Sequence, residues 1–191
     1  MPTDDPLAMF SALFERAGRE LAEPHAMVLS TVDPDGRPSA RYVLLKSVDE
    51  QGFVFYTNLG SRKARALAAH PHAALTFYWP PQTQVRIEGD VERVSDADAD
   101  AYFATRPRDS QIGAWASAQS APLASRATLD ERIRESETRF TSAPVTRPPF
   151  WSGFRVVPRS IEFWTRDPAR LHERVAFERS NGEWTRSLLF P

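Results

Sequence analysis

The sequence contains no cysteine among its 191 residues, which excludes disulfides, thiolate metal sites and cysteine nucleophiles. It has no apolar run of membrane-spanning length, and its N-terminus has no signal-peptide core. We therefore expect a cytoplasmic protein that does not bind to membranes. The net charge of −1, from 24 basic and 25 acidic residues, gives no global signal for nucleic-acid binding, and we expect none. Any anion site must come from a local cluster of cations.

Motifs of several common enzyme classes are also missing. The sequence has no GxSxG, HExxH or P-loop pattern, which disfavours hydrolytic chemistry and nucleotide binding of those kinds. The histidines have no metal-ligand spacing, because His70 and His72 flank a proline and have no evident third ligand. We expect no metal site.

Length and composition predict one soluble domain that is large enough to bury a core. Hydrophobic residues make up 41% of the chain and charged residues 26%, as in ordinary globular proteins. Most of the 12 Phe, 5 Trp and 4 Tyr must pack in this core, although some suit the walls of a planar-ligand site. We expect an N-terminal helix over residues 1–22, core strands over 23–95, a helical segment over 96–149 and further strands over 150–191.

Apolar runs separated by turn signals predict an antiparallel β structure with flanking helices. Ala26–Val32, Pro38–Val48 and Phe53–Asn58 are joined by short glycine-containing turns, so we expect them to form a three-stranded meander, as in a barrel or sandwich. Gly89 indicates a bulge, and Asn181-Gly182 is a strong hairpin signal. The other expected strands are His72–Trp79, Thr83–Val94, Gly153–Thr165, Leu171–Arg179 and Trp184–Phe190.

Helical periodicity and capping residues indicate several helices. An amphipathic pattern predicts a helix over Asp5–Leu21, and Ser61 suits the N-cap of a short helix that ends before Pro71. The remaining helices are expected at Asp96–Thr105, Arg108–Ser117 and Ser125–Thr141, with a loop at Ala118–Ala124.

The first group of residues with chemical potential lies between Arg41 and Lys63. Cations stand at both ends of an apolar strand, Arg41 and Lys46, and an adjacent pair, Arg62 and Lys63, opens a helix. Arginine offers a planar fork for phosphate oxygens, lysine offers a point charge, and a helix start offers free N–H groups. This pattern is consistent with a phosphate site, but also with scattered surface cations.

A second group consists of Tyr102, Arg106 and Ser110, around Pro107. The spacing of four residues across a proline break allows Arg106 and Ser110 to point into one pocket, with Tyr102 one helical turn earlier. The group is a candidate oxyanion site, and a helix-capping turn is the alternative.

A third group follows Trp164 near the C-terminus. If this segment is a strand, Arg170, His172 and Arg174 share one face, because side chains alternate with period two. His172 is a natural group for proton handling near neutral pH. A solvated face and a structural histidine are the alternatives.

Five segments together resemble a known family. They are RYVLLK at 41–46, FVFYTNLGSRK at 53–63, RPRDSQIGAWASAQS at 106–120, FW at 163–164 and RLHER at 170–174. In this order and spacing they closely resemble the pyridoxamine (pyridoxine) 5′-phosphate oxidases. The resemblance implies an antiparallel split β-barrel (α+β) that binds FMN, and a homodimer with FMN sites across the interface. It also implies oxidation of pyridoxamine or pyridoxine 5′-phosphate to pyridoxal 5′-phosphate, with O2 as acceptor and H2O2 released.

The resemblance also assigns roles to individual residues. It implies FMN binding by basic, amide, hydroxyl and aromatic side chains, namely Arg41, Lys46, Tyr56, Thr57, Arg62, Lys63, Gln84, Gln119, Ser120, Trp164 and Arg174. It implies that the substrate phosphate is held by Lys46, Tyr102, Arg106 and Ser110. Arg170 and His172 are implied to lie over the substrate ring as catalytic residues, which orient the substrate and assist proton removal during hydride transfer to the flavin.

The sequence departs from the family pattern at four places. Met1–Asp5 has nothing like the longer basic arm of many members, and Tyr78–Gln84 lacks the usual Pro-Trp-His run. Leu188 stands where an arginine is usual, and Tyr42 stands where a smaller or aliphatic residue is common. Two alternatives stay open: a related flavin oxidase that acts on another reduced ring, as in phenazine biosynthesis, and a non-catalytic FMN- or pyridoxal-phosphate-binding split barrel. The presence of Lys46, Tyr102, Arg106 and Ser110 favours a phosphorylated substrate.

Overall fold

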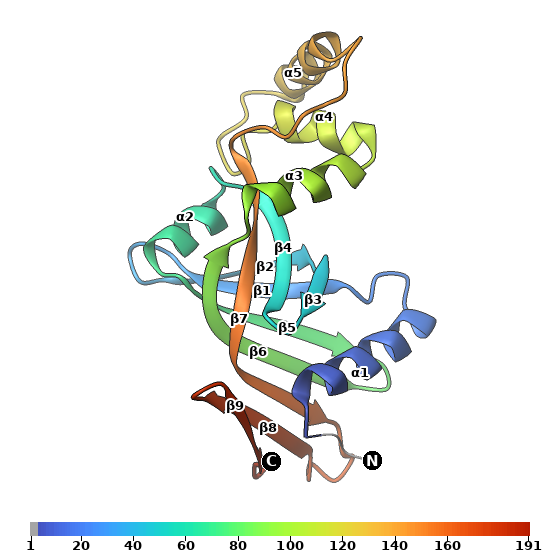
Figure 1. The fold of residues 1–191 in the computed structure, drawn as a ribbon, viewed down its shortest axis with the longest axis vertical. Coiled ribbons are helices and arrows are strands. Elements are labelled where there is room, and N and C mark those ends of the chain that lie inside the picture. The colour runs from blue at the N-terminus through green and yellow to red at the C-terminus, as the bar shows by residue number, and fades with distance from the viewer. Residues whose placement is uncertain (1–3) are drawn as a thin grey trace.

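In the computed structural model, which describes residues 4–191, an antiparallel sheet curls into an open half-barrel (Figure 1). The sheet order is β2-β1-β5-β6-β7-β4-β3, with β8 on the far half of β7 and β9 on β8. The strands are β1 Ala26–Val32, β2 Pro38–Leu44, β3 Ser47–Asp49, β4 Gly52–Asn58, β5 His72–Trp79, β6 Thr83–Arg93, β7 Trp151–Thr165, β8 Glu173–Ser180 and β9 Glu183–Leu188. The helices are α1 Pro6–Glu20, α2 Arg62–Ala69, α3 Asp96–Thr105, α4 Arg108–Ala116 and α5 Arg126–Arg139.

The expected antiparallel split barrel with flanking helices is confirmed. Three helix starts show why the local sequence predicted helix positions. Asp5, Ser61 and Ser95 each cap a helix by accepting a hydrogen bond from a backbone N–H group of its first turn. The part of the expected N-terminal segment at Met1–Thr3 lies outside the described residues. Within residues 4–191 no helix has the length and apolar character needed to cross a membrane.

One expected strand, Pro38–Val48, is in fact two strands on opposite edges of the sheet. β2 pairs with β1, whereas β3 pairs with β4, so the expected three-stranded meander was wrong. The chain changes partner at Leu45 and Lys46, whose N–H groups donate to His25 O at 2.8 Å and to Val54 O at 2.9 Å. An unbroken apolar run, Tyr42–Leu45, leads into this crossing with no proline or glycine, so the sequence pattern did not reveal it. The crossing places Lys46 where the two edges of the half-barrel meet.

The long strand β7 organises the rest of the molecule. Its first half pairs with β4, its second half pairs with β8, and β6 runs along its other edge. The bulge expected at Gly89 is present as a register shift between Glu88 and Gly89. A Cβ at Gly89 would lie 2.0 Å from Val157 O, so the close approach requires glycine. The expected hairpin at Asn181-Gly182 joins β8 to β9, with both residues at positive φ.

Two apolar clusters hold these layers together. In the half-barrel, Phe10 of α1 is fully buried and its ring packs 4.9 Å from Phe53 and 5.2 Å from Phe77. A second cluster, with Phe103, Ile112, Phe140, Val145 and Trp151 as its buried members, joins α3 and α4 to the start of β7. Figure 1 shows these helices beyond one end of β7, with β8 and β9 at the other end.

Candidate active site

A cavity of about 540 Å³ lies between β2, β4 and the loops and helices around α3 and α4. Its charged lining residues are Arg41, Lys46, Lys63 and Arg106, and no carboxylate is among the described residues that line it. The other lining residues with predicted roles are Tyr56, Thr57, Tyr102, Ser110 and Gln119. The cavity therefore brings the second sequence group together with all the cations of the first except Arg62, and its charge suits an anion.

Arg41 forms a fixed wall of this cavity. Its Nη1 donates to Leu29 O at 3.1 Å and to Thr31 Oγ1 at 2.8 Å, and its Nη2 donates to Ser39 Oγ at 2.7 Å. Burial lowers the pKa of Arg41. None of these three partners is a carboxylate, so the positive charge of Arg41 remains available to a ligand.

Lys63 lies beside Arg41 and is held by two side-chain oxygens. Its Nζ donates to Thr57 Oγ1 at 3.2 Å and to Gln119 Oε1 at 3.1 Å. Thr57 Oγ1 donates to Gln119 Oε1 at 2.9 Å, which fixes the loop after α4 onto β4. Burial lowers the pKa of Lys63, and the nearby charge of Arg41 lowers it further. Lys63 follows the N-cap Ser61, so the start of α2 adds its partial positive charge.

Arg62 lies at the start of α2 but does not line the cavity. Its Nε donates to Asp33 Oδ2 at 3.0 Å, and its Nη2 forms an ion pair with the same oxygen. Its backbone N–H donates to Ser120 Oγ at 3.1 Å, and Ser120 does not line the cavity either. Arg62 holds the pKa of Asp33 below its ordinary value through this hydrogen bond. Sequence reasoning missed Asp33, which had the pattern of an ordinary turn residue.

Stacked aromatic rings form the opposite wall. Tyr56 and Tyr102 stack with centroids 4.1 Å apart, and Tyr56 and Trp151 stack at 5.2 Å with planes 8° apart. A Cβ at Gly153 would lie 2.7 Å from the Tyr56 ring, so glycine lets the ring lie flat over β7. Trp151 was also missed from sequence, because the strand was expected to begin at Gly153, whereas β7 begins at Trp151.

Arg106 lies on this aromatic wall with an unused donor. Its Cζ is 4.8 Å from the Trp151 ring centroid and 5.4 Å from that of Phe103. Its Nη1 is buried and has no hydrogen-bond partner. Burial lowers the pKa of Arg106, and burial together with the charge of Arg106 lowers the pKa of Lys46. Two cations that are close together and an unpaired guanidinium N–H group are the features of a site for an anionic group.

A buried arginine fixes the helix that carries these residues. The Arg147 side chain is 10% exposed. Its Nε donates to Asp100 Oδ1 at 2.6 Å, and its Nη2 donates to Asp96 Oδ1 at 3.0 Å. Its Nη1 donates to Trp151 O at 2.8 Å. Arg147 thus joins α3 to the start of β7, on which the guanidinium of Arg106 rests.

The third sequence group does not reach this cavity. Gln84, Trp164 and Arg174 are cross-strand neighbours on β6, β7 and β8, and none of them lines the cavity. Trp151 and Trp164 stand near the two ends of the 15-residue β7. At about 3.3 Å per residue, roughly 40 Å of strand length lies between them. One copy of the chain therefore contains two separate groups of predicted site residues.

Arg170 and His172 precede β8, so the expectation that they share a strand face with Arg174 was wrong. β8 begins at Glu173, and Arg170 lies in a turn with φ +68°. The His172 ring packs against Trp164, with centroids 4.5 Å apart. The turn places His172 beside Trp164 of β7 through local hydrogen bonds, which period-two reasoning does not take into account.

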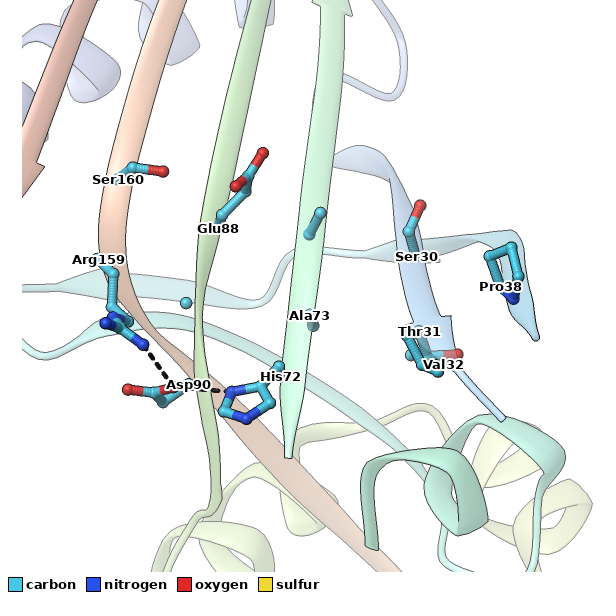
Figure 2. Close-up of a pocket in the computed structure, with 12 residues that line it drawn as sticks. Ser30, Thr31, Val32, Pro38, His72, Ala73, Glu88, Asp90, Arg159 and Ser160 are labelled. Carbon is cyan, nitrogen blue, oxygen red and sulfur yellow. Dashed lines mark hydrogen bonds and ion pairs between the residues drawn. The ribbon is translucent and has the colours of Figure 1, made fainter. Parts of the chain in front are cut away.

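A second cavity, of about 430 Å³, lies over β1, β5, β6 and β7 (Figure 2). His72 Nδ1 is 2.8 Å from Asp90 Oδ1, and Arg159 Nη1 is 3.8 Å from the same oxygen. This cavity is lined by two carboxylates, Glu88 and Asp90, and by one arginine, Arg159, and no predicted site residue lines it. The cationic cavity is the better candidate for an active site.

An antiparallel half-barrel with a cationic, aromatic-walled cavity defines the class, a split barrel with a candidate anion site. A family model described as "Pyridoxamine 5′-phosphate oxidase" matches residues 13–140. A second, "Pyridoxine 5′-phosphate oxidase C-terminal dimerisation region", matches residues 151–191 and supports a homodimer. The chain belongs to the pyridoxamine 5′-phosphate oxidase family, as the sequence motifs predicted.

Comparison with individual relatives supports the same family. "Pyridoxine/pyridoxamine 5′-phosphate oxidase" from Myxococcus xanthus (strain DK1622) is 58% identical over 189 residues, covering 98% of this chain and 92% of the relative. The protein of that name from Azorhizobium caulinodans is 55% identical over 192 residues, covering 98% and 91%.

Two solved structures share the fold. PhzG from Burkholderia lata 383, in complex with tetrahydrophenazine-1-carboxylic acid, has a TM-score of 0.93 at 30% identity, covering 100% of this chain and 94% of the other. A pyridoxamine 5′-phosphate oxidase-related, FMN-binding protein from Nostoc punctiforme PCC 73102 has a TM-score of 0.79 at 19% identity, with full coverage of both chains.

Proposed function

We propose that this protein oxidises pyridoxine 5′-phosphate and pyridoxamine 5′-phosphate to pyridoxal 5′-phosphate with FMN as cofactor. Dioxygen accepts the electrons and leaves as H2O2, and the amine substrate also consumes water and releases ammonia. The observation that carries the proposal is the cavity itself, with four cations, no lining carboxylate and an unpaired Arg106 donor. Identity above 50% to relatives named for this activity supports it.

The residues near Lys63 fit the phosphate of FMN. Arg41 and Lys63 supply charge, Thr57 and Gln119 hold the lysine, and the start of α2 supplies a positive dipole end. Arg62 does not line the cavity but remains a proposed ligand of the FMN phosphate. Its guanidinium is bonded to Asp33 through Nε and Nη2, so Nη1 can still donate to a phosphate oxygen. Bound FMN would accept a hydride from the substrate and pass the electrons to dioxygen.

The residues near Arg106 fit the phosphate of the substrate. Lys46, Tyr102, Arg106 and Ser110 all line the cavity, although they come from the strand crossing and from two helices. The buried Nη1 of Arg106 would find its missing acceptor in a phosphate oxygen. Holding the phosphate at this wall orients the pyridine ring and excludes water from one side of it.

We propose that Gln84, Trp164, Arg170, His172 and Arg174 complete the cavity of a second copy of the chain. In one chain the two groups lie near opposite ends of β7, with roughly 40 Å of strand length between them, so we do not expect one chain to place both on one flavin. A two-fold homodimer brings each group to the other chain's cavity, forming two equivalent sites. The dimerisation-region match, which covers all of these residues except Gln84, supports this arrangement.

Mixed dimers test the shared site. Arg106→Ala impairs the cavity half of the site and Arg170→Ala impairs the other half. At substrate concentrations far below the KM of the Arg106 variant, each variant alone should therefore be nearly inactive. Full subunit exchange between equal amounts should restore about a quarter of wild-type activity, because half of the dimers are mixed and each has one intact site. If each site were built within a single chain, mixing would restore nothing.

Anaerobic flavin bleaching tests the activity itself. The FMN-loaded protein should lose its yellow colour when either phosphorylated substrate is added, and air should restore the colour with release of H2O2. Bound FMN that neither substrate bleaches would refute the oxidase proposal. Failure to bind added FMN would refute the cofactor as well.

A second candidate is oxidation of another reduced ring. The PhzG structure favours it, since that protein shares the fold and binds a tetrahydrophenazine acid. Lys46, Tyr102, Arg106 and Ser110 around one cavity favour a phosphorylated substrate instead. Bleaching by a tetrahydrophenazine carboxylic acid but not by the two phosphates would reverse this preference.

A further inference from the structure

One ring nitrogen of His172 accepts a hydrogen bond from the main chain. The backbone N–H of Asp167 lies 3.0 Å from His172 Nδ1. An amide N–H can only donate, so Nδ1 must present its lone pair and accept. In the neutral imidazole the proton then lies on Nε2, because the hydrogen bond at one nitrogen fixes the tautomer of the ring.

The turn before His172 holds this amide in place. Ala169 N donates to Asp167 Oδ1 at 2.7 Å, and Arg170 N donates to Asp167 O at 3.1 Å. Arg166 N donates to Gln82 O at 3.1 Å, which ties the turn to the residue before β6. The turn closes with Arg170 in the left-handed region, at φ +68°. The Asp167 N–H is therefore a fixed donor.

The ring of His172 is held by one neighbouring ring and by one hydrogen bond. The Trp164 ring packs against it with the planes tilted by 44°, the Asp167 amide holds the Nδ1 edge, and among the described residues none forms a hydrogen bond with Nε2. Nε2–H is thus the ring's one free polar group, and its direction is set by the protein before any ligand binds.

We propose that His172 acts on the bound substrate as a hydrogen-bond donor through Nε2–H, with the Asp167 main chain as the positioning group. This inference rests on the proposed function, in which His172 meets the substrate in the cavity of the second copy. It changes the role expected from sequence, which was assistance to proton removal. A neutral ring in this tautomer has no lone pair at Nε2 to accept a proton, so its partner must be an oxygen or nitrogen lone pair of the substrate.

The tautomer can be measured without turnover. The FMN-loaded protein is labelled with 15N-histidine, and the His172 signals are assigned by their loss in His172→Gln. At alkaline pH we expect an unprotonated Nδ1 and a protonated Nε2 for His172. The opposite tautomer would overturn the proposal even if the protein proved to be an active oxidase. The expected tautomer in a protein without oxidase activity would instead place the failure in the proposed function.

Two amide substitutions then test the donor. The glutamine amide nitrogen reaches the position of Nε2, whereas the shorter asparagine amide reaches only that of Nδ1. We expect His172→Gln to keep kcat/KM within about threefold of wild type, and His172→Asn to lose about tenfold to a hundredfold. His72→Gln, at an exposed histidine outside the site, should change nothing. Both His172 variants should keep wild-type Tm and FMN affinity, and an Asn variant as active as the Gln variant would refute the donor role.

Discussion

Replacing Arg106 with methionine should separate ligand binding from stability. The buried Nη1 lacks a partner, and an unsatisfied buried donor costs about 1–3 kcal/mol in the ligand-free protein. The contacts with Trp151 and Phe103 offset this by about 0.5–2 kcal/mol each as cation–π interactions. Methionine keeps the apolar contact without the donor or the charge. We therefore expect the free energy of unfolding of ligand-free R106M to stay within about 1 kcal/mol of wild type.

The same substitution should strongly weaken substrate binding. A hydrogen bond from a charged donor contributes about 1.5–3 kcal/mol, so losing one should raise KM by about tenfold to a hundredfold. kcat should change much less, because the phosphate contact is made equally in the ground and transition states. Urea unfolding monitored by tryptophan fluorescence gives the stability, and peroxide release gives the kinetic constants.

Arg139 offers a matched control. Its guanidinium lies 4.1 Å from the Trp115 ring centroid and 5.2 Å from that of Phe140, and it does not line the cavity. R139M should lose a comparable cation–π contact and leave KM unchanged. A loss of more than about 3 kcal/mol in ligand-free R106M would show that the guanidinium is mainly structural. An unchanged KM in R106M would refute its role as a phosphate ligand.

Arg147 joins two α3 carboxylates to the first carbonyl oxygen of β7, so R147M should cost about 2–3 kcal/mol of unfolding free energy. R147M should also raise KM, and an unchanged KM would contradict the anchoring role. R126M, which removes an exposed i,i+4 pair, should cost under about 0.5 kcal/mol. Gly89→Ala places a Cβ 2.0 Å from a β7 carbonyl oxygen and should lower stability by about 1–3 kcal/mol. Gly113→Ala, in a helix with open space around it, should raise stability by about 0.5–1 kcal/mol, and equal effects of the two alanines would refute the packing argument. The hydrogen bond from Arg62 lowers the pKa of Asp33 in the folded protein. The stability that this pair gives to the fold is therefore complete above the unfolded pKa of about 3.9 and is lost as pH falls through the folded pKa. The Tm of D33N should thus fall less than that of wild type on acidification, and parallel curves would contradict this.

The elements that sequence predicted well are those set by local interactions. The expected bounds of β1, β5 and α3 match the structure, because alternation, a proline stop and a serine cap each act within a few residues. Pro38–Val48 failed because the change of strand partner at Leu45 and Lys46 depends on segments elsewhere in the chain.

In the candidate site, too, local features were predictable from sequence and contacts between distant segments were not. The chemistry of Arg41, Lys63 and Arg106 was readable as types of side chain, but spacing alone could not show that they share one cavity. Trp151 and Asp33 escaped notice because their roles arise only when α3 lies over β7 and when α2 meets the β1–β2 turn. The motif resemblance named most of the cavity residues, but it did not show how the two groups are divided within one chain.

The proposed division of each site between two chains predicts that flavin binding and dimer formation are linked. The region matched as a dimerisation region carries Trp164, His172 and Arg174, so the segment proposed to join two chains also carries half of each proposed site. A ligand that binds only the assembled state stabilises it by mass action. FMN should therefore lower the dissociation constant of the dimer, and Arg174→Ala, which removes a proposed contact from the second copy, should weaken that effect more than it weakens the flavin-free dimer. Sedimentation of the wild type and the variant at several FMN concentrations measures this. A dissociation constant that does not respond to FMN would mean that the flavin contacts one chain only.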